Sequence, residues 1–121
     1  MPPSSLKPPA ASDDESLILD SVDRFLEKHV EPVAHDLEAS DTWPAEIVRE
    51  MADLGLFGAT IGAQYGGLGL SASTYSKIVE RVSAVWMSVS GIFNSHLIMA
   101  AAVERFGTQE QKRTWLPRFA T

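Results

Sequence analysis

The chain has 121 residues, of which 45% are hydrophobic and 21% charged, and it contains no cysteine. This length fits one domain with a hydrophobic core of its own, and the lack of cysteine excludes disulfides and thiolate metal sites within it. The formal charge is −6 and no basic stripe is present, which argues against nucleic acid and anionic membranes as partners.

The first 12 residues differ in composition from the rest. They contain four prolines and one lysine, with no arginine and no apolar core of a signal sequence. We therefore interpret residues 1–12 as a disordered tail, and residues 13–121 as one helical domain. Asp13 or Asp14 is expected to cap the first helix. Apolar residues then keep helical spacing as far as Leu37, and Pro32 must kink this helix or start a second one.

The next helix is expected to begin with Pro44 at its first position and to end at Gly55 in the left-handed conformation. The apolar segment from Leu56 to Ile61 is short enough to be extended. Four glycines follow within residues 61–70. Because glycine reaches positive φ without a Cβ clash, this glycine loop is predicted to reverse the chain and to seat the helices that follow.

The second half of the sequence has clear helix boundaries. Ser71 is suited to cap a third helix, and a fourth is expected from about Trp86 to Arg105, after a break near Ala84. Thr108 and Gln111 have the spacing of a capping box for a fifth helix. The sequence therefore predicts an all-α fold, an irregular bundle of five to six helices.

Between Arg81 and Glu104 the chain carries no formal charge when His96 is neutral. A membrane span needs about 20 predominantly apolar residues. Small or polar residues interrupt this run, so we expect no membrane span and instead a helix buried on all sides. The interruptions are Ser83, Ser88, Ser90, Gly91, Asn94, Ser95 and His96.

One face of this helix carries small, mostly polar side chains, at Ser90, Gly91, Asn94 and Ser95. Glycine at position 91 costs about 1 kcal/mol relative to alanine in a helix interior, which indicates that something nearby needs the space. Residue chemistry leaves two interpretations open. The face either packs tightly against another helix, or it forms a pocket wall with Asn94 as a hydrogen-bonding group.

No complete active site can be assembled from residue types alone. The glycine loop lacks the Gly-Lys-Ser/Thr of a phosphate-binding loop and the spacing of a dinucleotide fingerprint. The three histidines, at positions 29, 35 and 96, lack metal-ligand spacing, so no metal site is expected. Serine, histidine and aspartate all occur, but no nucleophile elbow does.

Several short motifs, in this order and at these spacings, resemble the N-terminal helical domain of acyl-CoA dehydrogenases. The resemblance covers about residues 16–121. Each motif is weak alone, but the ordered set is specific. The motifs are Trp43-Pro44-Ala45-Glu46-Ile47, Leu54-Gly55-Leu56-Phe57-Gly58, Tyr65-Gly66-Gly67-Leu68-Gly69-Leu70-Ser71, Phe106-Gly107-Thr108-Gln109-Glu110-Gln111-Lys112 and Trp115-Leu116-Pro117.

The resemblance implies a three-domain FAD enzyme that forms an α,β double bond in an acyl-CoA thioester. In this family a glutamate of the C-terminal domain takes the α-proton, and the β-hydride goes to flavin N5. Most members pass electrons to an electron-transfer flavoprotein, and most are homotetramers. The resemblance also implies a cytoplasmic protein, or one of the mitochondrial matrix in a eukaryote. The middle β-domain and the C-terminal helical domain, with most of the flavin site and the catalytic base, are expected beyond Thr121.

Aligned on the Gly107-Thr108 signature, the resemblance assigns one wall of the acyl pocket to this chain. The substrate-binding positions it implies are Ser90, Gly91, Asn94, Ser95 and Ile98. No catalytic residue is expected in this segment, which by itself should neither hold FAD firmly nor oxidise acyl-CoA. Two alternatives stay open, namely a flavin-dependent relative of the monooxygenase or nitroalkane oxidase type, and a free-standing helical interaction module.

Overall fold

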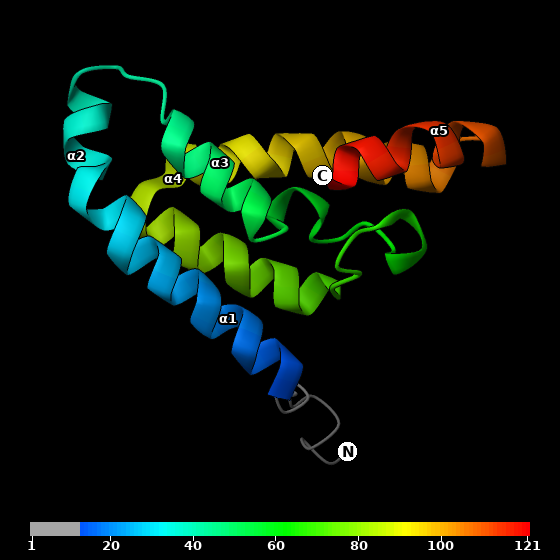
Figure 1. Ribbon diagram of the computed structural model, residues 1–121, viewed down its shortest axis with the longest axis horizontal. Coiled ribbons are helices and arrows are strands. Elements are labelled where there is room, and N and C mark those ends of the chain that lie inside the picture. The colour runs from blue at the N-terminus through cyan, green and yellow to red at the C-terminus, as the bar shows by residue number, and fades with distance from the viewer. Residues whose placement is uncertain (1–12) are drawn as a thin grey trace, which may run out of the picture.

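The computed structural model describes residues 13–121, so the tail predicted for residues 1–12 lies outside it. The described residues are helical with no strand, which confirms the predicted all-α fold (Figure 1). Five α-helices form four runs, because a π-helical turn joins the first two. The elements are α1 (Asp13–Phe25), η2 (Leu26–Val30), α2 (Glu31–Ala39), α3 (Ala45–Asp53), η3 (Leu56–Gly58), η4 (Ala63–Tyr65), α4 (Ala72–Phe106) and α5 (Gln109–Ala120).

The junction between α1 and α2 is set by Pro32, which lies in the first turn of α2. Proline lacks an N–H and its ring clashes with the carbonyl four residues earlier, so the helix widens into the π-turn η2 just before it. Leu26 and Val30 nevertheless stay buried. The expected break at Pro32 is confirmed. The prediction that Asp13 or Asp14 caps α1 was wrong, because both residues already lie inside the helix.

Helix α3 begins at Ala45, with Pro44 at the preceding cap position, one residue away from the prediction. Gly55 ends this unit at φ 83°, in the left-handed conformation that was expected. The segment from Leu56 to Ile61 is not extended, as the sequence had suggested, but forms the 3₁₀ turn η3 followed by further turns. The N–H groups of Gly58, Ala59 and Ile61 donate to carbonyl oxygens three residues earlier, and a Cβ at Gly58 would lie 2.9 Å from the carbonyl oxygen of Ala120.

The glycine loop folds back onto the turn that precedes it. The N–H groups of Leu68, Gly69 and Leu70 donate to carbonyl oxygens of residues 58, 61 and 59 at 2.8–2.9 Å. At Gly67 a Cβ would lie 2.1 Å from the carbonyl oxygen of Ile61, so only glycine fits this approach. The predicted reversal of the chain is confirmed, and it consumes the loop's own backbone donors.

Helix α4 folds back on itself at Trp86, whose φ of −158° and ψ of 99° are not helical. Figure 1 shows its two halves meeting at an acute angle beside α2. The predicted break near Ala84 therefore occurs two residues later. Across the bend, Ser83 Oγ donates to Ser90 Oγ at 2.8 Å, and Trp86 Nε1 donates to a Glu38 carboxylate oxygen at 2.6 Å. These bonds connect the bend to itself and to α2.

The inner sides of the two halves of α4 contribute to the core, where they pack against α1, α5 and the turn η3. Ile78 and Val82 from the first half, and Val89 and Phe93 from the second, are completely buried. The caps predicted for the starts of α4 and α5 are both present. Ser71 accepts the N–H of Thr74, and Thr108 and Gln111 form a capping box.

By length and composition alone, α4 is apolar enough to cross a membrane, with a mean hydropathy of 1.3 over its most apolar window. It is the one such helix among the described residues. A core helix of a soluble protein passes the same test. Here the bend at Trp86 interrupts the helix, and its inner residues are part of the core, so the finding is weak evidence for a span.

Replacing Phe93, a fully buried ring, by alanine should lower the free energy of unfolding by about 3–5 kcal/mol, because it removes apolar contacts and leaves a cavity. Met99 lies on the same helix half but is 56% exposed, so Met99→Ala is the matched control, expected to stay within about 0.5 kcal/mol of the parent. Denaturant unfolding followed by far-UV circular dichroism measures both. Equal losses in the two variants would contradict this description of the core.

Candidate functional site

The outer side of the second half of α4 is open to solvent and carries no charge from Met87 to Ala102. Met87 is 72% exposed and Ile98 is 63% exposed. Gly91 and Ser95 lie between them at helical spacing, and a Cβ at Gly91 would meet nothing within 4 Å. We call this surface, formed by Met87, Gly91, Ser95, Ile98 and Ala102, the open face.

The expectation that this helix is buried on all sides was wrong. Its inner side packs into the core, whereas no described element covers its outer side. The lack of charged residues in this helix shows only that neither its inner nor its outer side carries a charge. It does not distinguish a side covered within the domain from a side that is open in the domain by itself.

The five residues assigned to the acyl pocket are not all equivalent in the structure. Gly91, Ser95 and Ile98 lie on the open face, and Asn94 lies half-buried at its edge. Ser90 is turned away from it and is only 5% exposed. Its hydroxyl donates to the carbonyl oxygen of Met87 at 2.7 Å and accepts from Ser83. Of the two interpretations, tight packing therefore fits Ser90, and an open wall fits Gly91, Asn94, Ser95 and Ile98.

Asn94 has a partner that the sequence analysis did not identify. The hydroxyl of Tyr75, from the first half of α4, donates to Asn94 Oδ1 at 2.5 Å. The ring of Tyr75 is half-buried and meets Phe93 edge-on, with ring centroids 6.2 Å apart. Nineteen residues separate Tyr75 from Asn94, so no local spacing signals the pair. Only the bend at Trp86 brings them together.

Burial raises the pKa of the Tyr75 hydroxyl to about 12, which keeps it a hydrogen-bond donor far above neutral pH. A folded-state pKa above the unfolded value of about 10 means that the contribution to stability is full below pH 10 and is lost as the pH rises toward 12. Allowing for partial exposure, we expect a loss of about 1 kcal/mol in that window.

The measurement is urea unfolding of the parent chain and of Tyr75→Phe between pH 9 and 12. The phenylalanine variant should lack this part of the decline, because it has no hydroxyl to ionise. Tyr65 is the other tyrosine of the chain, which makes Tyr65→Phe the control. An equal decline in the free energy of unfolding of the parent and of Tyr75→Phe would contradict the assignment of this loss to the Tyr75 hydroxyl.

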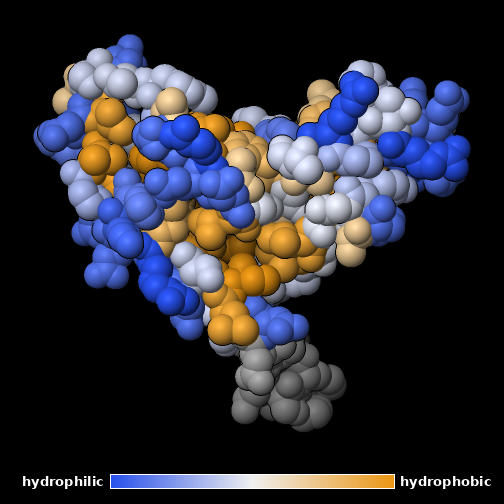
Figure 2. Space-filling model, in the orientation of Figure 1, coloured by the Kyte–Doolittle hydropathy of each residue, from blue (hydrophilic) through white to orange (hydrophobic). Residues whose placement is uncertain are grey.

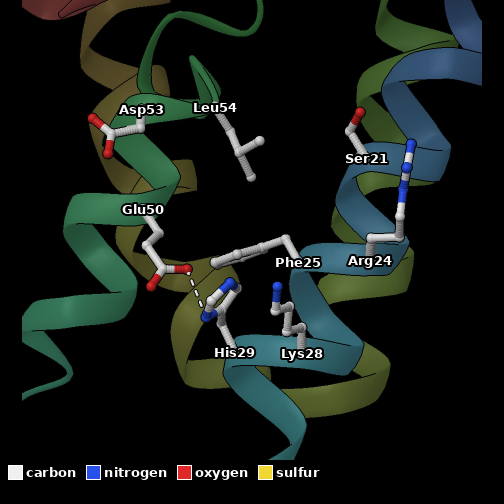
Figure 3. Close-up of a pocket in the computed structure, with 8 residues that line it drawn as sticks. All are labelled: Ser21, Arg24, Phe25, Lys28, His29, Glu50, Asp53 and Leu54. Atoms are coloured by element: carbon white, nitrogen blue, oxygen red, sulfur yellow. Dashed lines mark ion pairs between the residues drawn. The ribbon is translucent and has the colours of Figure 1, made fainter.

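A second concave surface lies between α1 and α3, with a volume of about 450 Å³. Figure 3 shows Phe25 and Leu54 between two charged rims, with Arg24 and Lys28 on one side and acidic residues of α3 on the other. Apolar surface also gathers in the middle of the face seen in Figure 2, between hydrophilic outer sides. The groove is therefore amphipathic, with opposite charges on its two walls.

One polar contact closes an end of this groove, where His29 Nδ1 lies 3.2 Å from Glu50 Oε2, and it is an ion pair only when His29 is protonated. The pair ties the π-turn η2 to α3. Both side chains are partly exposed, so its contribution to stability is small. The groove was not singled out by sequence reasoning, since its charged residues look like any solvated helix surface. Within residues 13–121, no group of three or more His, Cys, Asp or Glu side chains is arranged to hold a metal.

The structure thus defines an all-α domain whose longest helix presents an uncharged open face with one amide at its edge. Such a face suits the wall of a pocket for a largely apolar ligand. The family profile described as "Acyl-CoA dehydrogenase, N-terminal domain" matches residues 12–121. The chain therefore belongs to the acyl-CoA dehydrogenase family, as its N-terminal domain, and the resemblance found in the sequence is confirmed.

Individual relatives agree with this assignment. The chain is 37% identical over 97 residues to the acryloyl-CoA reductase (NADH) of Anaerotignum propionicum, covering 78% of this chain and 24% of that protein. It is 36% identical over 111 residues to the (2S)-methylsuccinyl-CoA dehydrogenase of Cereibacter sphaeroides, covering 89% and 20%. The chain thus spans a quarter or less of the length of each of these two relatives.

A solved structure supports the fold. It is described by the words "Electron transferring flavoprotein of Acidaminococcus fermentans: Towards a mechanism of flavin-based electron bifurcation". The TM-score is 0.85 and the sequence identity 26%, over 94% of this chain and 30% of that chain. The match covers the bent α4 together with the helices packed around it.

Among the described residues, the glycine loop does not offer free backbone donors to a flavin phosphate. The glycine loop is the segment that most resembles a phosphate cradle, but Gly67, Leu68, Gly69 and Leu70 all donate their N–H groups to carbonyls of residues 58–62. A cofactor phosphate needs such donors free. We therefore derive no chemical step through a flavin from this chain's own residues.

Proposed function

We propose that this chain is the N-terminal domain of an FAD-dependent acyl-CoA dehydrogenase, and that the open face of α4 is one wall of its acyl pocket. The reaction removes a proton from Cα and a hydride from Cβ of the thioester, leaving an α,β-enoyl-CoA. FAD, held mainly by the rest of the protein, accepts the hydride. The contribution of this chain is to bind and orient the acyl chain.

The observation that carries the proposal is the open face itself. The saturated tail of a thioester needs an uncharged, water-excluding surface, and Met87 and Ile98 offer apolar area that no part of this domain covers. Gly91 and Ser95 leave width for the tail because their side chains are minimal. Asn94 supplies a polar group at the edge, and Ser90 supports the wall from behind by fixing the bend.

The family match and the CoA thioesters named for the relatives support acyl-CoA as the substrate class. They give no support to a free-standing interaction module, and no observation favours a monooxygenase or nitroalkane oxidase. The similar structure described with an electron-transferring flavoprotein supports such a protein as the electron acceptor. Homotetramer formation, and a location in the cytoplasm or the mitochondrial matrix, complete the proposal.

The direct test uses the protein from the complete reading frame that encodes this chain, loaded with FAD, and measures oxidation of butyryl-CoA and hexanoyl-CoA with an artificial electron acceptor. Gly91→Phe should raise KM for hexanoyl-CoA by about tenfold or more, because a ring would fill the space beside the helix. Ala39→Phe, on the exposed end of α2, is the matched control and should leave KM unchanged.

No turnover or binding of either thioester by the complete protein would overturn the proposal. So would a Gly91→Phe variant with the parent's KM. The 121-residue chain alone should show no dye reduction with FAD and butyryl-CoA, since we assign most of the flavin site and the catalytic base to the rest of the protein.

The open face should also make the 121-residue chain self-associate, because exposed apolar area is buried when two copies meet. Static light scattering should show a mass that rises with concentration. Ile98→Glu places a charge in the centre of the open face and should shift the chain toward monomer, whereas Leu17→Glu, on the exposed side of α1, should not. A parent chain that stays monomeric at every concentration would contradict this expectation.

A further inference from the structure

The side-chain amide of Asn94 is satisfied at one end only. Its Oδ1 accepts the hydrogen of the Tyr75 hydroxyl at 2.5 Å. Within residues 13–121, its Nδ2 group has no hydrogen-bond partner. An asparagine amide has two N–H donors in addition to its acceptor oxygen. Asn94 therefore has two N–H donors without a protein partner among the described residues, and the hydrogen bond from Tyr75 to its oxygen fixes the orientation of the amide.

The location of these donors matters. Asn94 follows Gly91 by three residues and precedes Ile98 by four, so all three lie on neighbouring positions of one helix surface. The space beside Gly91 is open. The Tyr75 ring that orients the amide is itself held edge-on against Phe93, which is completely buried. The amide is thus a preoriented donor beside the open face, and it rests on a rigid part of the core.

A purely hydrocarbon chain bound on the open face would displace water from the two Asn94 N–H donors and offer them no acceptor. Leaving a polar group without a partner on desolvation corresponds to roughly a 5- to 150-fold loss in affinity. A ligand with an oxygen at that depth restores the hydrogen bond. Sites with such groups reject analogues that lack the matching oxygen more strongly than apolar pockets discriminate by size.

We propose that Asn94, oriented by Tyr75, determines substrate specificity, and that the acyl chain this protein prefers carries a hydrogen-bond-accepting oxygen beyond Cβ. The inference rests on the proposed function, because it needs the open face to line the acyl pocket. Asn94 donates to the oxygen of the acyl chain. Tyr75 is a positioning residue, which acts on the substrate only through the Asn94 amide.

The test compares acyl chains of equal length with the complete, FAD-loaded protein. In 4-methoxybutyryl-CoA an ether oxygen replaces one methylene of hexanoyl-CoA, and in 5-methoxypentanoyl-CoA one methylene of heptanoyl-CoA, both beyond the reacting carbons. We expect kcat/KM about tenfold higher for the ether in the pair whose oxygen reaches Asn94. Isothermal titration calorimetry of the same thioesters should give the same preference in Kd.

Three variants separate the roles. Asn94→Leu keeps the size of the side chain and removes both donors, so the alkyl chain should become the preferred one. Tyr75→Phe should reduce the ether preference to about one- to threefold while leaving kcat for hexanoyl-CoA near the parent value, a split that general destabilisation does not produce. Tyr65→Phe is the tyrosine control and should keep the full preference.

A spectroscopic readout is independent of catalysis. Asn94 is the only asparagine of the 121-residue chain, so selective ¹⁵N-asparagine labelling gives a single side-chain amide signal. Tyr75→Phe should shift and broaden that signal as the amide loses its fixed orientation, and Tyr65→Phe should not. An unshifted signal in Tyr75→Phe would overturn the positioning role.

The outcomes distinguish this inference from the function on which it rests. If neither hexanoyl-CoA nor butyryl-CoA binds or is oxidised, the proposed function fails. If both are oxidised but the ether and alkyl chains of both pairs react equally well in the parent and in Asn94→Leu, the specificity inference alone is overturned.

Discussion

The bend of α4 at Trp86 is the constraint on which the rest of the structure depends. A single non-helical residue turns a 35-residue helix back on itself, so that both halves contribute to one core. Two hydrogen bonds, from Ser83 to Ser90 and from Trp86 to Glu38, close the bend and attach it to α2. Without the bend, the fully buried side chains of the two halves would have no common core to fill.

The bend also divides the second half of α4 into two sides with different tasks. The inner side stabilises the domain, because residues such as Val89 and Phe93 are withdrawn from water completely. The open face contributes nothing to that stability, yet it keeps apolar side chains at Met87 and Ile98 in water. Exposed apolar surface of this kind marks contact with something else. The side that stabilises the domain and the side proposed to contact a ligand are thus opposite sides of one helix.

Local signals in the sequence were sufficient for most of the fold. Ser71, Thr108 with Gln111, and Gly55 act at helix ends through contacts with residues a few positions away, and such contacts can be read from spacing. The wrong predictions concern features that depend on residues far apart in the sequence. The turn after Gly55 lies so close to Ala120 that a Cβ at Gly58 would not fit, and no other described element covers the open face. Tyr75 holds Asn94 across the bend from 19 residues away, a separation that no local spacing signals.

The same reasoning separates two polar residues that the sequence treated alike. Ser90 and Asn94 are one helical turn apart, and the family resemblance assigned both to the pocket wall. In the structure, the Ser90 hydroxyl both donates and accepts within the bend, which leaves it a structural role. Asn94 has only its acceptor engaged, and its donors stay available beside the open face. The number of hydrogen bonds already made, rather than the residue type, therefore decides which polar group of this helix can recognise a ligand.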